Sequence, residues 1–427
     1  HGGAAWGIHV GTRHGGTSLS TDHDTTPHGT GLPPVSDWTT DYDVLDADYV
    51  ADPYPVWDDL REQCPIAHTE RWGGSWLPTR YADVQRFAQD HHGFNSTDVG
   101  VLTFDEDERP PPPVDLRLPP IDSDQPEHTW TRRLMLPWFS HTRVAEYEPY
   151  TRDLCNRLID GFIENGSADA AGDYARQIPV RVISLVLGVP DEMADTFTGW
   201  VQDLLEFAHE EARATRGRDA LTLYLLEQLE HRRTNPGDDL MSALLHTEVE
   251  GEAVPDLTIL GMAALTLIAG VDTTWSGIGS AMLHLAENPQ DVKRLLDEPE
   301  IMPLAIEELL RAYSPVTMAR IASDDVEVEG CPIKAGDKVL MNFPGANRDP
   351  EVFEHPDQVI LDRAQNRHVA FGAGIHRCAG SNLARMELRV AIEVWLERIP
   401  EFRLADDGEV TWAGGQVRGP RTVPVVF

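Results

Sequence analysis

The stretch Phe371-Gly-Ala-Gly-Ile-His-Arg-Cys378-Ala-Gly380 is a glycine-rich loop that presents one cysteine just before a predicted helix. Backbone N–H groups at a helix start, with the positive end of the helix dipole, stabilise a thiolate and lower its basicity. A thiolate held in this way is able to ligate haem iron. Glycines at 372, 374 and 380 would let the backbone approach a flat macrocycle closely, where any Cβ would collide. Taken alone, Cys378 fits an inert buried thiol equally well.

Upstream of this loop the sequence predicts a helix from about 256 to 288, because Pro255-Asp256 is a start signal and Asn288-Pro289 a stop signal. Such a helix would be roughly 48 Å long and would cross the whole molecule. Its middle, AALTLIAGVDTTWSGIG, is nearly uncharged, which is typical of a helix buried in a large core. Asp272 and Thr273 are costly there, so they either bond back to the helix backbone or face a wet cavity.

The remaining patterns predict the order of the other elements. Helical periodicity begins near Tyr54, a short strand-like pair follows from Trp72 to Thr79, and another helix begins at Tyr81. Residues 99–126 contain too many prolines for a helix or a central strand and predict a long binding loop. Helices dominate from about 127 to 312, and short β-type runs, a helix from about 380 to 397 and a terminal β-like stretch follow. The predicted class is mainly α with a minor β portion.

Composition also predicts the domain organisation and the cellular location of the chain. Residues 1–40 lack periodicity and predict a flexible leader, and residues 41–427 predict one large domain. The cysteines form neither a CxxC pair nor a zinc-ligand spacing, so we expect no disulfide framework; they are Cys64, Cys155, Cys331 and Cys378. No uninterrupted apolar run reaches the eighteen or so residues that a membrane span needs. The sequence therefore predicts a cytoplasmic protein without a membrane partner.

Charge separates this chain from several protein classes. With 71 acidic and 35 basic residues the net charge is −36, which excludes the basic surface that nucleic-acid binding needs. Only Lys293, Lys334 and Lys338 are lysines, so arginine carries nearly all the positive charge. Salt screens the repulsion of such a surface, and a halophilic source is the favoured interpretation. A GC-rich genome that encodes arginine in place of lysine is the alternative.

Several motifs together carry a family resemblance. The pattern FxxGxHxCxG resembles the haem-binding loop of the cytochrome P450 family. Three further segments look like that family's motifs, in its order: Ala269-Gly-Val-Asp-Thr-Thr274 like the oxygen-binding motif, Glu308-Leu-Leu-Arg311 like the ExxR pair, and His128-Thr-Trp-Thr-Arg132 like HxxxR. The resemblance covers roughly residues 45 to 427. It implies the cytochrome P450 fold, a single large domain with a long central helix over the haem.

The resemblance also implies a role for each motif residue. Cys378 would be the proximal ligand of haem b (iron protoporphyrin IX), Thr273 would hydrogen-bond bound oxygen, and Asp272 would help to relay protons. The residues expected to contact the haem are Ala269, Gly270, Phe371, Gly372 and Gly380, and those expected to hold its two carboxylates are His128, Arg132, Arg320 and His376.

Glu308 and Arg311 would form a buried clamp under the cysteine loop. The family often completes this clamp with an arginine in a P-x-R-F stretch, whereas this chain has Pro356-Asp357-Gln358-Val359. Two interpretations follow from the departure: either Gln358 substitutes for the arginine, or the third contact is missing.

The function implied is a monooxygenase that inserts one oxygen atom from O2 into a lipophilic substrate, with electrons from a separate ferredoxin and ferredoxin reductase. A peroxide-dependent haem peroxygenase and a non-enzymatic haem sensor are the alternatives, and a monomer is expected. The expected substrate pocket is lined by mostly small or apolar residues: the 99–126 loop, Ala264, Ala269, Val316, Thr317, Met318, Ala319 and the turn at 414–417.

Overall fold

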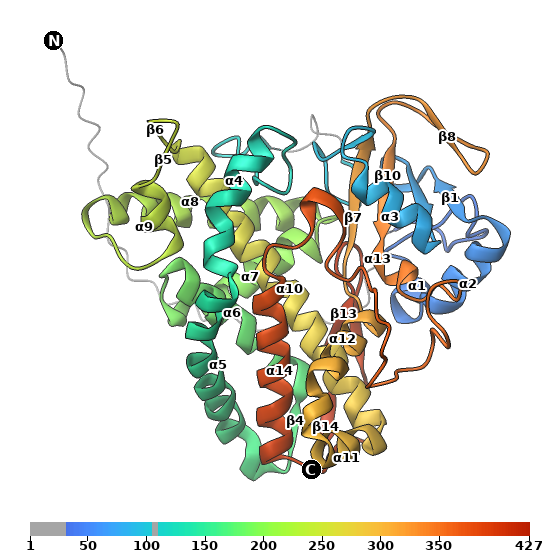
Figure 1. Ribbon diagram of the computed structural model, residues 1–427, viewed down its shortest axis with the longest axis vertical. Coiled ribbons are helices and arrows are strands. Elements are labelled where there is room, and N and C mark those ends of the chain that lie inside the picture. Colours follow the sequence, from blue (N-terminus) through green and yellow to red (C-terminus); the bar gives the residue numbers. More distant parts are fainter. Residues whose placement is uncertain (1–30, 105–109) are drawn as a thin grey trace.

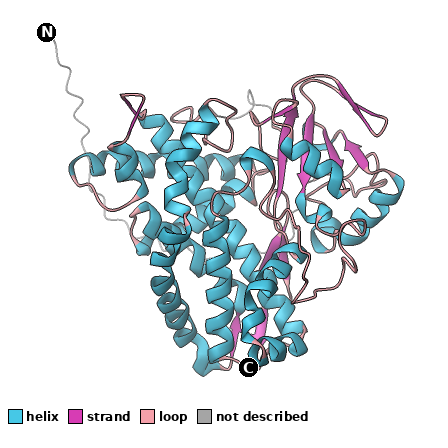
Figure 2. Ribbon diagram, in the orientation of Figure 1, coloured by secondary structure: helices cyan, strands magenta, loops and turns pink. Residues whose placement is uncertain are grey.

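The computed structural model describes residues 31–104 and 110–427, and its helices fill one side of the molecule while most strands gather on the other (Figures 1 and 2). The helices are α1 (Ala47–Ala51), α2 (Tyr54–Gln63), α3 (Tyr81–Gln89), α4 (Glu127–Met135), α5 (His141–Phe162), α6 (Gln177–Leu187), α7 (Ala194–Leu205), α8 (Glu211–Thr234), α9 (Leu240–Leu245), α10 (Asp256–Glu287), α11 (Pro289–Asp297), α12 (Met302–Ala312), α13 (Phe343–Ala346) and α14 (Ser381–Arg398).

The strands form one five-stranded sheet of order β1-β2-β10-β7-β3 and smaller sheets around it. They are β1 (Ile66–Thr69), β2 (Ser75–Pro78), β3 (Phe94–Asn95), β4 (Ser167–Asp169), β5 (Glu248–Val249), β6 (Glu252–Ala253), β7 (Thr317–Ala322), β8 (Val326–Val328), β9 (Cys331–Ile333), β10 (Lys338–Asn342), β11 (Arg403–Leu404), β12 (Thr411–Ala413), β13 (Gly419–Thr422) and β14 (Pro424–Val426). The prediction of a mainly α domain with a minor β portion is confirmed.

Helix α10 is the centre of the helical side, and the largest apolar cluster of the described chain is built around it. It contacts α6, α7, α8 and α14, and in Figure 1 its yellow ribbon passes behind the red α14. It begins and ends within a residue of the predicted limits. Its length and composition would be enough for a membrane span, although it has no uninterrupted apolar run of that length, but 67% of its most apolar window is buried in the protein. It is a core helix.

The N-terminal predictions held for the helices and failed for one strand. Helices α2 and α3 begin at Tyr54 and Tyr81, as predicted. The predicted strand pair from Trp72 to Thr79 is wrong: only β2 lies there, and it pairs with β1 on the other side of a turn. Trp72 has a positive φ of 54° in that turn, followed by positive-φ glycines, a turn signal that the strand prediction overlooked.

The predicted leader and the proline-rich loop are described in part. Residues 1–30 lie outside the described residues, whereas Trp38 stacks on Tyr49 with ring centroids 5.8 Å apart. Residues 105–109 also lie outside them. The described remainder of 99–126 contains no helix and no strand, as predicted.

Candidate active site

The cysteine loop is shaped by two positive-φ glycines and one backbone hydrogen bond. Gly372 and Gly374 have φ of 70° and 71°, values that favour glycine. The Cys378 N–H donates to Phe371 O at 2.8 Å and closes the loop just before α14. A Cβ at Gly374 would collide with the carbonyl oxygen of Ala88, so this glycine makes room for α3 rather than for a macrocycle. The loop is thus wedged between the end of α3 and the start of α14.

Cys378 is solvent-accessible, as is Arg377 before it, while Ala379 after it is half-buried. Desolvation by the protein atoms around its Sγ raises the pKa of the thiol, while the Gly380 N–H and the Arg132 guanidinium act to lower it. The helix start alone therefore does not give the low basicity that the sequence predicted. A metal ion bound at the sulfur would supply the missing positive charge, because coordinated thiols lose their proton. The donor chemistry fits a haem iron.

Four basic side chains from three segments, namely α4, β7 and the cysteine loop itself, come together at this loop. The rings of His128 and His376 are 4.4 Å apart, His376 Nε2 is 2.9 Å from Ser96 Oγ, and Arg132 donates to the carbonyl of Arg377. Arg320 is buried, and its hydrogen bond within the described chain is to Ala319 O at 2.7 Å.

This cluster has little negative charge beside it, although Asp124 lies close enough to act against the lowering of the Arg320 and His128 pKa values. Among described residues, no carboxylate forms an ion pair with Arg132, Arg320, His128 or His376, and neither buried ring nitrogen of His128 makes a hydrogen bond of good geometry. Burial lowers the pKa of Arg320 to about 10, and burial followed by Arg320 lowers the pKa of His376 to about 2. Buried and half-buried donors without an ion-pair partner favour an anion, and the two carboxylates of haem fit them.

On α10 the predicted oxygen-binding motif interrupts the buried surface of the helix. Ala269 is exposed and Thr273 half-buried, although the neighbours Val271 and Asp272 are buried. The Thr273 hydroxyl donates to Ala269 O at 2.8 Å, so in this state it is bonded back to its helix. A Cβ at Gly270 would come within 2.5 Å of Ile183 Cδ1, which shows that the glycine allows α6 to pack closely.

Asp272 takes part in a buried network that sequence reasoning missed. Arg421 of β13 donates to Asp272 Oδ1 at 2.8 Å, to Glu206 Oε2 at 2.9 Å and to Ser276 Oγ at 3.1 Å. Gly419 permits this reach, because a Cβ there would collide with Ser276 of α10. Burial raises the pKa of Asp272 to about 6, Arg421 opposes the rise, and Asp272 Oδ2 is buried without a partner. One cation is shared by two carboxylates.

The predicted clamp is complete, but its third member was predicted wrongly. Glu308 and Arg311 are fully buried and form two hydrogen bonds of 2.8 and 2.9 Å. Arg363, five residues beyond Gln358, supplies the third contact at 2.9 Å from Glu308 Oε2. Gln358 contributes only its carbonyl oxygen, which accepts from Arg311 at 2.9 Å. The arginine is therefore displaced along the chain rather than absent.

The described chain holds a cavity of about 260 Å³ that borders the predicted substrate residues. Its lining is mostly apolar and includes Val101, Leu102, Phe104, Leu204, Leu205 and Gln416. Gln416 joins it to β7, since its carbonyl accepts from Thr317 N at 3.0 Å. The 99–126 loop and the 414–417 turn thus line this cavity, whereas Ala264 and Ala319 are buried in the surrounding core and Val316 and Met318 lie half-buried beside it.

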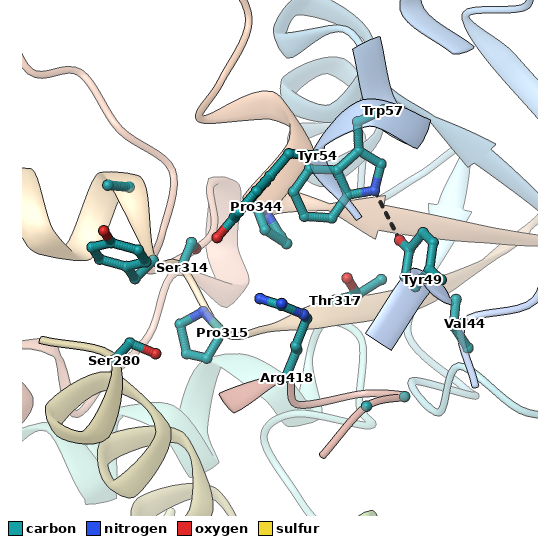
Figure 3. Close-up of a pocket in the computed structure, with 14 residues that line it drawn as sticks. Val44, Tyr49, Tyr54, Trp57, Ser280, Ser314, Pro315, Thr317, Pro344 and Arg418 are labelled. Carbon is teal, nitrogen blue, oxygen red and sulfur yellow. Dashed lines mark hydrogen bonds between the residues drawn. The ribbon is translucent and has the colours of Figure 1, made fainter. Parts of the chain in front are cut away.

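A second hollow lies on the sheet side and is too small for a substrate. Tyr49, Tyr54, Trp57 and Arg418 surround it, with Trp57 Nε1 donating to Tyr49 Oη at 2.9 Å (Figure 3). Thr317 lines it as well. Its volume of about 20 Å³ has room for about one water molecule. Because this hollow is too small for a substrate, the position of Thr317 in its lining does not test the prediction that Thr317 contacts the substrate.

The comparisons agree with the site. A family model for cytochrome P450 matches residues 173–408. The chain is 35% identical over 379 residues to the mycinamicin IV hydroxylase/epoxidase of Micromonospora griseorubida, which covers 86% of this chain and 94% of that protein. It is 35% identical over 402 residues to the vitamin D(3) 25-hydroxylase of Pseudonocardia autotrophica, with 91% and 97% covered.

A solved structure is similar over the same length. A cytochrome P450 of Bacillus megaterium in complex with testosterone superposes with a TM-score of 0.81 at 28% identity, covering 89% of this chain and 98% of that chain. Taken with the cysteine loop, the α10 motif and the clamp, these matches leave one assignment: the chain belongs to the cytochrome P450 family and is a cytochrome P450 monooxygenase.

Proposed function

We propose that this monooxygenase binds haem b against the Cys378 loop and inserts one oxygen atom from O2 into a lipophilic substrate. The observation that carries the proposal is the accessible Cys378 thiol beside four basic side chains that form no ion pair within the described chain. When bound, haem supplies the dioxygen-activating chemistry, which an axial thiolate promotes. Every other task falls to the chain itself.

The chain would hold and orient the cofactor from two directions. Cys378 Sγ would ligate the iron, and the basic residues would hold the two carboxylates by charge-assisted hydrogen bonds; those residues are His128, Arg132, Arg320 and His376. Phe371, Gly372 and Gly380 would contact one face through the loop, while Ala269 and Gly270 would contact the other from α10. The clamp of Glu308, Arg311 and Arg363 fixes the segment that leads into the loop.

Proton delivery would begin at Asp272 and end at Thr273. A pKa of about 6 allows the Asp272 carboxyl to gain and lose a proton near neutral pH, which is the property that a proton relay needs. Arg421 holds the carboxylate in place. The Thr273 hydroxyl, which now donates to Ala269 O, would leave that oxygen and hold the proton for transfer at its Oγ1. This pair also supports dioxygen use over the peroxide-dependent and sensor alternatives, neither of which needs a proton relay.

The substrate would be a lipophilic molecule bound near the 260 Å³ cavity. Its apolar lining supports this class, and mycinamicin, vitamin D(3) and testosterone in the names of similar proteins are all large lipophilic molecules. Thr317, Met318 and Ala319 on β7, with Val316 before it and Ala264 on α10, do not line this cavity and would contact the part of the substrate that extends beyond it.

The electrons would come from a ferredoxin and its reductase, and the ferredoxin would bind at the face around Cys378. The enzyme would be a monomer in the cytoplasm. Arg377, exposed beside Cys378, offers a cationic contact on a protein of net charge −36. Turnover with ferredoxin and NAD(P)H, compared with hydrogen peroxide alone, tests this part of the proposal; turnover by peroxide alone would favour the peroxygenase.

Replacing the proposed ligand tests the haem assignment. Cys378→Ser should abolish the reduced-CO absorption band that marks thiolate-ligated haem. Cys331→Ser is the matched control, because Cys331 is half-buried on β9 and should leave the band intact. Retention of the band in Cys378→Ser, or its loss in Cys331→Ser, would refute the assignment.

A further inference from the structure

Lys338, at the start of β10, is a buried lysine whose contacts no motif explains. Its side chain is 4% exposed, at the middle of the five-stranded sheet. Burial lowers the pKa of its ammonium group, and Asp98 opposes the change. A buried ammonium is unfavourable unless each of its donors is paired.

All the donors of Lys338 are paired, and every acceptor belongs to one short segment. Lys338 Nζ is 2.8 Å from Gly100 O, 3.2 Å from Leu102 O and 2.8 Å from Asp98 Oδ2. An ammonium has three N–H donors, so the group is fully satisfied by residues 98–102. These acceptors lie more than two hundred residues earlier in the chain, so the contact is tertiary.

The same segment forms a wall of the proposed substrate cavity. Gly100, Val101 and Leu102 line the 260 Å³ cavity, opposite Leu204 and Leu205 at the end of α7. Val101 and Leu102 are themselves buried in an apolar cluster with Leu340, which is on the same face of β10 as Lys338. Lys338 therefore holds residues 98–102, which form this wall of the cavity, against the five-stranded sheet.

We propose that Lys338 is a positioning residue that fixes this wall and so determines how tightly the cavity binds its substrate. The inference rests on the proposed function only for the identity of the ligand; the contact with residues 98–102 does not depend on it. Lys338 touches no proposed haem-binding residue, so its loss should weaken binding in the cavity and leave binding at the iron unchanged.

Amide hydrogen exchange tests the anchoring directly. In Lys338→Met the peptides spanning 98–104 should exchange at least about ten-fold faster, because their local opening becomes easier. Lys334→Met is the matched control: Lys334 precedes β10, is 62% exposed and pairs with Asp325 at the surface. Unchanged exchange in Lys338→Met, or an equal increase in Lys334→Met, would overturn the proposal.

Two imidazoles separate cavity binding from iron binding in the haem-loaded protein. Imidazole needs only the iron, whereas 4-phenylimidazole must also place its ring in the cavity. Lys338→Met should raise the Kd of 4-phenylimidazole by roughly ten-fold relative to imidazole; equal changes for both would overturn the proposal. A wild-type protein that takes up no haem, and so has no Soret band, would refute the proposed function instead, and the exchange experiment would still decide the role of Lys338.

If Lys338→Met fails to fold, Asp98→Asn replaces it. The amide oxygen can still accept from Gly100 N, now 3.0 Å from Asp98 Oδ1, while the charge facing Lys338 is lost. Exchange at 98–104 should again accelerate, by less than in the lysine variant. Unchanged exchange there would count against the anchor.

Discussion

Arg421→Met removes the one cation that Asp272 and Glu206 share, and its effect should depend on pH. Arg421 contacts both carboxylates within 2.9 Å, and the side chains of all three residues are at most 10% exposed. Leaving a buried charge without its partner costs about 3–5 kcal/mol. Asp272 can escape part of that loss by taking up a proton, since its pKa is already about 6. The variant should raise this pKa further, by between about one and three units.

The direction of the pH effect on unfolding free energy follows from the difference between the folded-state and unfolded-state pKa values of Asp272. The folded-state pKa of Asp272 lies above its unfolded value, so ionisation of this carboxyl disfavours the fold. With the pKa raised from 3.8 to about 6, the penalty is about 3 kcal/mol at pH values above the folded pKa and disappears below the unfolded one. Removing Arg421 raises the folded-state pKa of Asp272 further, so the pH range over which the penalty grows extends to higher pH. The loss of unfolding free energy should therefore be largest at mildly alkaline pH and shrink as the pH falls through the new pKa.

Urea unfolding of the wild type and Arg421→Met across this pH range measures the effect. Arg294→Met is the control, because Arg294 binds Asp362 at 2.7 Å in a partly exposed pair and should cost little at any pH. A destabilisation by Arg421→Met that does not vary with pH would refute the shared-cation reasoning. In turnover assays the pH dependence of the variant should move upward with the Asp272 pKa.

Two further predictions concern coupling and salt. Thr273→Ala should leave haem absorbance intact and lower product formed per NAD(P)H, because its hydroxyl is proposed to serve bound oxygen; unchanged coupling would leave Thr273 as the back-bonded residue that the structure shows. The thermal midpoint should rise steeply from dilute buffer to molar KCl, since salt screens a net charge of −36. Salt also weakens exposed pairs such as Lys293–Asp297, but each is worth at most about 1 kcal/mol, so a flat midpoint would contradict this reasoning.

Local patterns were sufficient to predict the cysteine loop and α10. A start signal at Pro255-Asp256, an apolar run and a stop signal at Asn288-Pro289 delimit α10, and the positive φ of the turn at residues 372 and 374 favours glycine there. The prediction of a strand pair near Trp72 was wrong for a local reason too. The composition there is typical of a strand, but Gly73-Gly74 is a turn signal that breaks the strand.

The contacts that complete the site could not be predicted because they join residues far apart in the chain. Arg421 lies 149 residues from Asp272, and Lys338 lies 238 residues from Gly100. Arg363 was missed because it stands five residues beyond the position where the family pattern places an arginine. In each case burial makes a charged side chain depend on one specific partner, and that partner is set by packing rather than by sequence spacing.

The scarcity of lysine gives this protein an unusually simple pattern of amine reactivity. Lys293 on α11 and Lys334 before β10 are 74% and 62% exposed, whereas Lys338 is 4% exposed and fully hydrogen-bonded. Acylating reagents should therefore modify two lysine side chains and spare the third. Acylation of Lys338, read by peptide mass spectrometry, would then report that residues 98–102 have moved away from the sheet, in any buffer and without an added ligand.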